Sequence, residues 1–92
     1  MEKDPLKQFG QRLVEIRKQE GYSQERLALE SGTARSYLSG VECGLRNIAI
    51  LNIYKLAETL DVPPSTLLEP PTKQEDYESD IQRFILFEKK PS

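Results

Sequence analysis

Apolar side chains recur at three- and four-residue steps in the first part of the chain, the spacing of one face of an α-helix. They are Leu6, Phe9, Leu13 and Ile16. Pro5 suits the first turn of this helix, and Asp4 can cap its amino end. Gly21 ends it, because glycine readily adopts the conformation that follows a helix. The pattern therefore predicts a first helix that begins near Pro5.

Two short helices are predicted next, separated by Ser31-Gly32. Ser23 caps the first of them, and Gly32 supplies the positive φ that a tight turn between helices often needs. We expect Thr33 to cap the second, which runs from residue 34 to about 43 and stops at Gly44. A fourth helix is predicted from about residue 50 to 60, and a fifth from 64 to 68, bounded by prolines. No internal repeat is visible.

The last stretch begins as a polar linker and then becomes apolar at Ile81 and at Phe84 to Phe87. Phe84 to Phe87 could form a β-strand, or together with Ile81 the apolar face of a helix, and periodicity does not separate the two. We therefore expect an all-α protein with five helices, followed by a short tail element whose secondary structure the pattern leaves undecided. Residues 1–71 form one domain in this interpretation, and residues 72–92 a linker and apolar tail.

The two short helices that meet at Gly32 have the form of a helix-turn-helix. Leu27, Leu38 and Val41 would fill the core between them, and Ala28 allows a close approach. This arrangement leaves polar and small side chains on the outer face of the second helix: Ala34, Arg35, Ser36, Ser39 and Cys43. Such a helix fits the major groove of B-DNA, with its amino-terminal residues at base edges. Double-stranded DNA is therefore the expected partner.

Composition narrows the function further. The 92 residues carry a net charge of −2, with eight Lys or Arg and seven Asp or Glu in residues 1–48 but five and eight in residues 49–92. Only the first half thus favours an anionic partner, and only slightly. One cysteine and no histidine exclude an internal disulfide and a Cys/His zinc site, which suits a cytoplasmic protein.

The same composition argues against catalysis. Without histidine the chain has no histidine base to activate a nucleophile, and it has no glycine-rich phosphate loop. The acidic residues 75–80 lie in the polar linker, where a solvated charge run is the simpler reading. The longest apolar runs have four residues and cannot span a bilayer. We expect no enzyme, cofactor, metal, membrane contact or small-molecule ligand.

Several segments resemble one known family, the Cro/phage-repressor-like (XRE-type) helix-turn-helix proteins. The resemblance covers roughly residues 7–69 and is carried by GYSQE, LA, SG and SYLSGVE, which begin at Gly21, Leu27, Ser31 and Ser36. Within the family the chain is most similar to controller proteins of restriction–modification systems, which share the run from Arg35 to Gly40 and an Arg-Asn pair, here Arg46-Asn47. The resemblance implies a sequence-specific transcriptional regulator that binds a pseudo-palindromic operator as a homodimer.

The resemblance also assigns roles to matching residues. Arg35 is the best candidate to read a base, since arginine can donate two parallel hydrogen bonds to guanine. Ser36 and Ser39 are further candidates for base contacts. The expected contacts to the DNA backbone come from Gln24, Tyr37, Arg46 and Asn47. An internal ion pair between Arg17 and Glu42 would fix the tilt of the second helix of the helix-turn-helix, the recognition helix, against the helix that begins near Pro5.

Three positions depart from the controller pattern. Cys43 stands where arginine is common and Ala34 where aspartate is common. Ala49 replaces the usual Ser or Thr cap of the fourth helix, a loss of about 1 kcal/mol if nothing compensates. The first two departures leave the operator sequence of this chain open. Cys43 is interpreted as an inert small residue, because neighbouring Glu42 opposes a thiolate.

The fourth helix has more apolar surface than one core needs. Six apolar side chains share an arc of about 160°, wider than the roughly 100° stripe of a surface helix, and Leu51 lies outside that arc. Leu67 and Leu68 are adjacent and can hardly both face one core. We therefore expect a homodimer interface that contains Leu51, Tyr54, Lys55, Leu67 and Leu68.

One alternative stays open at this point. Some proteins with this fold are antitoxins or adaptors that bind a partner protein. The same fold, or the apolar tail at Phe84 to Phe87, could serve that purpose.

Overall fold

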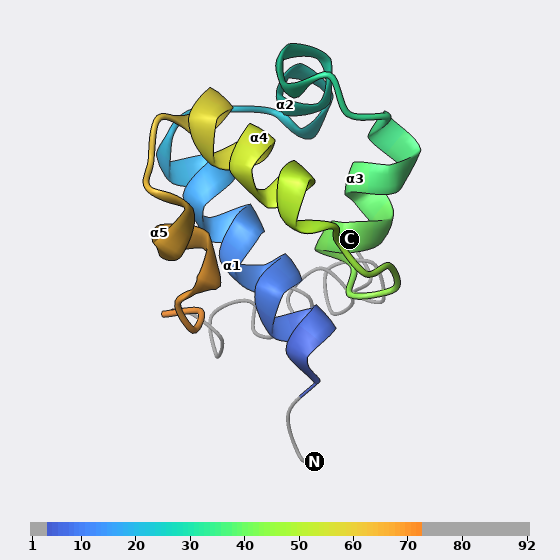
Figure 1. The fold of residues 1–92 in the computed structure, drawn as a ribbon, viewed down its shortest axis with the longest axis vertical. Helices are drawn as coiled ribbons and strands as arrows, with labels where there is room; N and C mark the ends of the chain where they lie inside the picture. The colour runs from blue at the N-terminus through green and yellow to red at the C-terminus, as the bar shows by residue number, and fades with distance from the viewer. Residues whose placement is uncertain (1–3, 73–92) are drawn as a thin grey trace, which may run out of the picture.

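A computed structural model describes residues 4–72, which form five helices and no strand (Figure 1). The helices are α1 (Pro5–Gln19), α2 (Gln24–Ser31), α3 (Arg35–Glu42), α4 (Ile50–Leu60) and α5 (Pro64–Leu68). The predicted all-α class and all five helices are confirmed. No helix within this range is long and apolar enough to cross a membrane. The tail element expected around Ile81 and Phe84 to Phe87 lies outside the described residues.

The ends of the helices follow from local chemistry, with one exception. The side chains of Asp4 and Ser23 accept hydrogen bonds from backbone N–H groups of α1 and α2, as expected. Gly32 closes α2 in the left-handed region, with φ of 73°. The prediction that Thr33 caps α3 is wrong, because α3 begins one residue later and the Thr33 Oγ1 accepts from Ser31 Oγ at 3.0 Å, while its N–H closes α2 on the Ala28 carbonyl. The N-cap of α3 is Ala34, which makes no side-chain cap bond.

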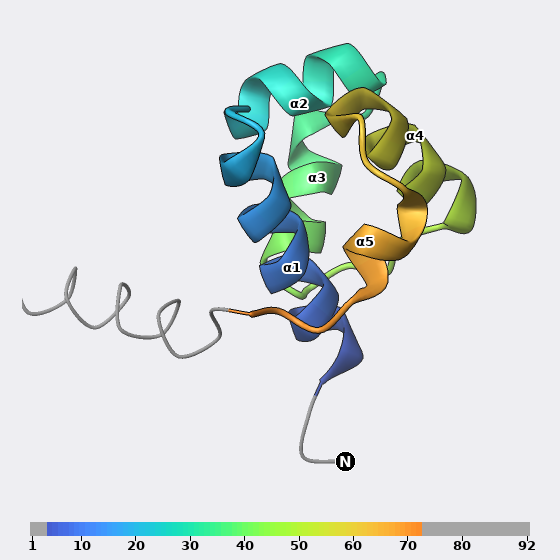
Figure 2. The same ribbon diagram turned by 90° about the vertical axis from the view of Figure 1, so that its left-hand side faces the viewer.

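One core joins all five helices. It consists of buried apolar side chains, the largest of which are Leu13, Leu27, Leu38, Leu56, Leu60, Leu67 and Val41. Helix α1 contacts α3 and α5, α2 contacts α3 and α4, and α4 contacts α5. Figure 2 shows α1 running along the domain with α4 and α5 together on one side of it. Helices α3 and α5 thus both pack against α1.

Helix α1 approaches α3 so closely that only glycine fits at one position. A Cβ atom at Gly10 would lie 2.5 Å from the Glu42 carbonyl oxygen and 2.6 Å from that of Val41. These are backbone atoms, so the neighbouring chain cannot move aside as a flexible side chain could. The carboxyl end of α3 is therefore seated directly on α1.

Candidate nucleic-acid interface

Helix α3 lies at the edge of the domain (Figure 1) and has one buried and one open face. Leu38 and Val41 point into the core and are at most 1% exposed. Ala34, Arg35, Ser36 and Cys43 are exposed, and Ser39 is half-buried. The structure therefore puts the expected base-reading side chains on one open helix face, where Ser39 is less exposed than Arg35 and Ser36.

A buried ion pair sets the orientation of this helix. Arg17 of α1 donates from Nε to Glu42 Oε2 at 2.7 Å and from Nη2 to Oε1 at 3.1 Å. Its remaining Nη1 donates to the Tyr22 carbonyl at 3.0 Å. Glu42 is the last residue of α3 and its side chain is 5% exposed. The pair implied by the family resemblance is therefore present as a two-pronged, charge-assisted contact between α1 and α3.

Two of the expected backbone contacts are occupied within the domain. Gln24 Nε2 donates to Glu42 Oε1 at 3.0 Å, so the first residue of α2 is tied to the same ion pair. The Tyr37 hydroxyl lies 3.3 Å from the Asn47 carbonyl, 3.4 Å from the Ala49 N–H and 3.2 Å from Asn52 Nδ2. A hydroxyl has one proton and two lone pairs, so these three contacts use its full capacity. A phosphate contact by Tyr37 would therefore require one of them to open.

The Tyr37 hydroxyl also contacts the amino end of α4. Ala49 is the N-cap of α4 and makes no side-chain cap bond. Its N–H instead donates to the Tyr37 hydroxyl, and the Asn52 side chain of the first turn donates there too. The recognition helix thus supports the amino end of α4, a role that local sequence patterns do not reveal.

In and just after α3, the positively charged side chains are exposed and the negatively charged one is buried. Arg35 and Arg46 are exposed, whereas Glu42, the one acidic residue between positions 31 and 57, is 6% exposed and paired with Arg17. Asn47 is exposed beside Arg46, with its Oδ1 accepting from the Ile48 N–H at 2.9 Å. The open face therefore presents positive charge, even though the chain as a whole is acidic. This arrangement suits a polyanion.

Helices α4 and α5 expose a second surface, which we call the α4–α5 patch. It contains Ile50, Leu51, Tyr54 and Leu68, which are 66%, 72%, 56% and 61% exposed. Lys55 is exposed next to them on α4. The prediction that Leu67 belongs to this surface is wrong, because α5 turns Leu67 fully into the core and leaves Leu68 outside. Leu29 and Leu45 are also largely exposed, which the helix patterns did not indicate.

The sequence matches a family model for helix-turn-helix domains over residues 13–67, more than half of the chain. The chain belongs to the helix-turn-helix family. Its relatives include the control protein C.BamHI of Bacillus amyloliquefaciens, which is 42% identical over 62 residues, 66% of this chain and 76% of that protein.

Two solved structures of helix-turn-helix proteins resemble this chain in fold and sequence. The restriction-modification controller protein C.AhdI of Aeromonas hydrophila is 55% identical, with a TM-score of 0.66 over 67% of this chain and 94% of that one. The biofilm regulator SinR, solved in complex with DNA, is 44% identical, with a TM-score of 0.64 over 66% of this chain and 98% of that one. SinR is a helix-turn-helix transcriptional regulator of Bacillus subtilis.

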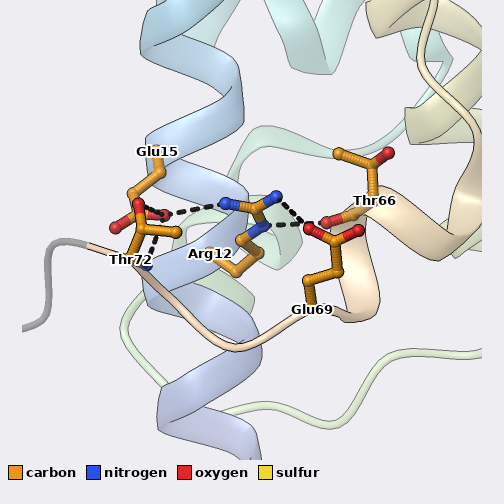
Figure 3. Close-up of polar contacts among 5 residues, drawn as sticks. All are labelled: Arg12, Glu15, Thr66, Glu69 and Thr72. Carbon is orange, nitrogen blue, oxygen red and sulfur yellow. Dashed lines mark hydrogen bonds and ion pairs between the residues drawn. The ribbon is translucent and has the colours of Figure 1, made fainter.

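A second buried arginine of this helix-turn-helix domain was not predicted from the sequence. Arg12 of α1 donates to the Thr66 carbonyl at 2.8 Å, to Glu69 Oε1 at 2.8 Å and to Glu15 Oε1 at 3.1 Å (Figure 3). Thr72 adds contacts from its N–H and hydroxyl to the same Glu15 oxygen. We call these five residues the Arg12 cluster. It fastens α5, and the chain that leaves it, to α1.

Proposed function

We propose that this helix-turn-helix protein is a sequence-specific DNA-binding transcriptional regulator that binds a pseudo-palindromic operator as a homodimer. The observation that carries the proposal is the open face of α3, where Arg35 and Ser36 are exposed and the nearby acid is buried. An α-helix of this kind fits the major groove, where base edges differ between all four base pairs. The ion pair of Arg17 and Glu42 presents that face in a fixed orientation.

Individual side chains have separate roles in this proposal. Arg35 reads a guanine edge with two hydrogen bonds, and Ser36 and Ser39 contact neighbouring bases. Arg46 and Asn47 bind backbone phosphates. Gln24 does so as well, with the Nε2 proton that it does not donate to Glu42, at the amino end of α2 where free N–H groups favour an anion. Tyr37 contributes through its support of α4 and reaches the DNA backbone only if its internal bonds open.

The proposed dimer interface lies on the α4–α5 patch. It is formed by Leu51, Tyr54 and Leu68 of the patch, together with the neighbouring Lys55. In a two-fold dimer each patch pairs with its own copy. Two recognition helices on one side of such a dimer can enter successive major grooves about 34 Å apart. A palindromic operator follows from this symmetry.

The biological setting is the controller of a restriction–modification operon, which the similarity to C.BamHI and C.AhdI supports. A regulator of this kind works on DNA in the cytoplasm and needs no catalysis, cofactor or metal. In this proposal residues 1–71 are the DNA-binding and dimerisation domain, and residues 72–92 follow it as a separate linker and tail.

Binding to the DNA upstream of the protein's own gene tests the DNA-reading role. Arg35→Ala should weaken binding to that DNA by about 1–3 kcal/mol and relax its sequence preference. The same variant should bind a scrambled duplex almost as well as the wild type does. Equal affinity of Arg35→Ala and wild type for the promoter DNA would contradict the groove assignment.

Sedimentation at micromolar concentration tests the dimer. Leu51→Glu should convert the dimer to a monomer, because two carboxylates would be buried against each other across the interface. Leu29→Glu is the matched control, since Leu29 is exposed to a similar extent on α2 and should leave the dimer intact. A wild-type monomer, or a dimeric Leu51→Glu variant, would refute this interface and favour a partner protein on the patch.

A further inference from the structure

The side chain of Arg46 lies directly against Gly40, in the middle of α3. A Cβ atom added at Gly40 would be 2.7 Å from Arg46 Cγ, 3.4 Å from its Cδ and 3.5 Å from its Cβ. The first distance is shorter than real carbon atoms tolerate. The aliphatic part of Arg46 therefore occupies the space that any other residue at position 40 would fill.

The main chain brings Arg46 back to this point. The carbonyl of Gly40 accepts from the N–H of Leu45 at 2.9 Å and from the N–H of Arg46 at 3.2 Å. Gly44 makes the turn with φ of 76°, seated where a Cβ would meet Lys7 Cγ at 2.6 Å and Lys7 Cα at 2.9 Å. The residues after α3 are thus folded onto the helix, and the start of the Arg46 side chain has a defined place.

Gly40 lies on the open side of α3. It follows Ser36 by one helical turn, so the two residues are neighbours on the same face. The backbone at Gly40 does not have the positive φ that would itself require glycine. A glycine inside a helix is unfavourable compared with alanine. The contact with Arg46 is therefore the feature of the structure that explains why this position lacks a side chain.

We propose that Gly40 is a positioning residue for Arg46: its missing side chain lets the arginine lie across the open face of α3 and hold its guanidinium toward DNA. This inference rests on the proposed function, in which Arg46 binds a phosphate. Any side chain at position 40 would push the stem of Arg46 off the helix. The arginine would remain charged but would lose its fixed direction.

The test compares wild type, Gly40→Ala, Arg46→Ala and the double variant. Each is titrated onto a scrambled 30-base-pair duplex at several salt concentrations, because phosphate contacts do not depend on sequence. Each variant removes one phosphate contact from each copy in the dimer, which should lower affinity roughly 30- to 100-fold at 0.1 M salt and reduce the salt slope by about 1.8. Gly40→Ala should approach this loss, and the double variant should bind no more weakly than Arg46→Ala. Leu45→Ala, an uncharged change in the same loop, should leave the slope unchanged.

Thermal melting separates a positioning role from a general loss of structure. Alanine favours a helix, so the double variant, which lacks the obstructing arginine, should melt at or above the temperature of Arg46→Ala. Wild-type slope and affinity in Gly40→Ala would overturn the inference, as would additive losses in the double variant. If Arg46→Ala loses affinity while Gly40→Ala does not, this inference alone fails. If the wild type does not bind duplex DNA, the proposed function fails with it.

Discussion

Helix α1 carries two arginines whose side chains are only 7% and 12% exposed, and each holds a different helix of the domain. Arg17 holds α3, the proposed DNA-reading helix, through a contact with Glu42 at 2.7 Å. Arg12, five positions earlier, holds α5 through Glu69 and the Thr66 carbonyl, both at 2.8 Å. The same residue type on one helix thus serves the DNA side and the proposed dimer side of the domain.

The two contacts differ in what surrounds the carboxylate. The Glu42 side chain is 5% exposed, whereas the Glu69 side chain is 58% exposed. Both bonds from Arg17 to α3 go to Glu42, and its third bond goes to the Tyr22 carbonyl outside α3. Arg12 instead reaches two different acceptors, the Thr66 carbonyl within α5 and Glu69 just after it. The ion pair that holds α3 therefore has one carboxylate, whereas α5 is held through two separate residues. A mutation should expose this difference directly.

The largest effect is expected at Glu42. Glu42→Ala leaves Arg17 buried beside α3 without its carboxylate, which should lower the free energy of unfolding by about 3–5 kcal/mol. Chemical denaturation monitored by circular dichroism gives this value. A loss below about 1 kcal/mol would show that the pair does not hold α3.

An intermediate effect is expected at Arg12. Arg12→Met keeps much of the buried stem but removes the donors to Thr66, Glu69 and Glu15, at a cost of about 1.5–3 kcal/mol. Because α5 carries Leu68, the dimer should also dissociate at higher protein concentration than wild type. Sedimentation and denaturation of the same variant measure both quantities. A variant with lower stability but an unchanged dimer would show that the Arg12 cluster does not act on the α4–α5 patch.

A smaller effect is expected at Glu69. Its exposed carboxylate is well solvated, so Glu69→Ala should lower the free energy of unfolding by only about 0.2–1 kcal/mol. Arg12 keeps Glu15 and the Thr66 carbonyl in this variant. The comparison between the two arginines would be wrong if Glu69→Ala were as destabilising as Glu42→Ala.

The smallest effect is expected at the exposed pair of Arg26 and Glu30 on α2. The hydrogen bond from Arg26 Nε, 2.9 Å from Glu30 Oε2, lowers the pKa of the Glu30 carboxyl below its ordinary value. The Glu30 carboxyl therefore binds a proton more readily in the unfolded chain than in the folded one. The stability contributed by the pair is present above the pKa of Glu30 in the unfolded chain and is lost as pH falls through its pKa in the folded protein. Carbon-13 titration of the carboxyl measures the pKa. Arg26→Gln should raise the pKa of Glu30 toward its ordinary value. An unchanged pKa in this variant would show that the pair does not stabilise the Glu30 carboxylate.

Local signals in the sequence were sufficient for most of the fold. Helix α1 combines an apolar stripe with Pro5 and Asp4 at its start, and the structure has all three where the pattern predicts them. Thr33 is not the cap because α3 begins one residue later and the Thr33 hydroxyl pairs with Ser31, which depends on the turn geometry at Gly32. The sequence indicated that Leu67 and Leu68 cannot both face the core, but it did not indicate which of them is exposed. The path of α5 decides this, with Leu67 buried and Leu68 exposed.

Contacts between distant positions were beyond local pattern reading. Arg12 and Glu69 are 57 positions apart, and no local sequence pattern around either residue indicates that they pair. Gly10 likewise reads as an ordinary helical glycine until α3 is seen to pack on it. The pair of Arg17 and Glu42 was anticipated only because a family resemblance supplied it. The α3 surface was accessible to sequence reasoning because its apolar and polar faces separate within eight residues.

Hydroxyl-radical footprinting of the DNA upstream of the protein's own gene tests the central claim most directly. A homodimer that places α3 of each copy in successive major grooves should protect two regions related by two-fold symmetry, with centres about 10 base pairs apart. Arg35→Ala should remove both regions together, because the two copies contribute the same residue. A single protected region, or protection that survives in Arg35→Ala, would contradict the account.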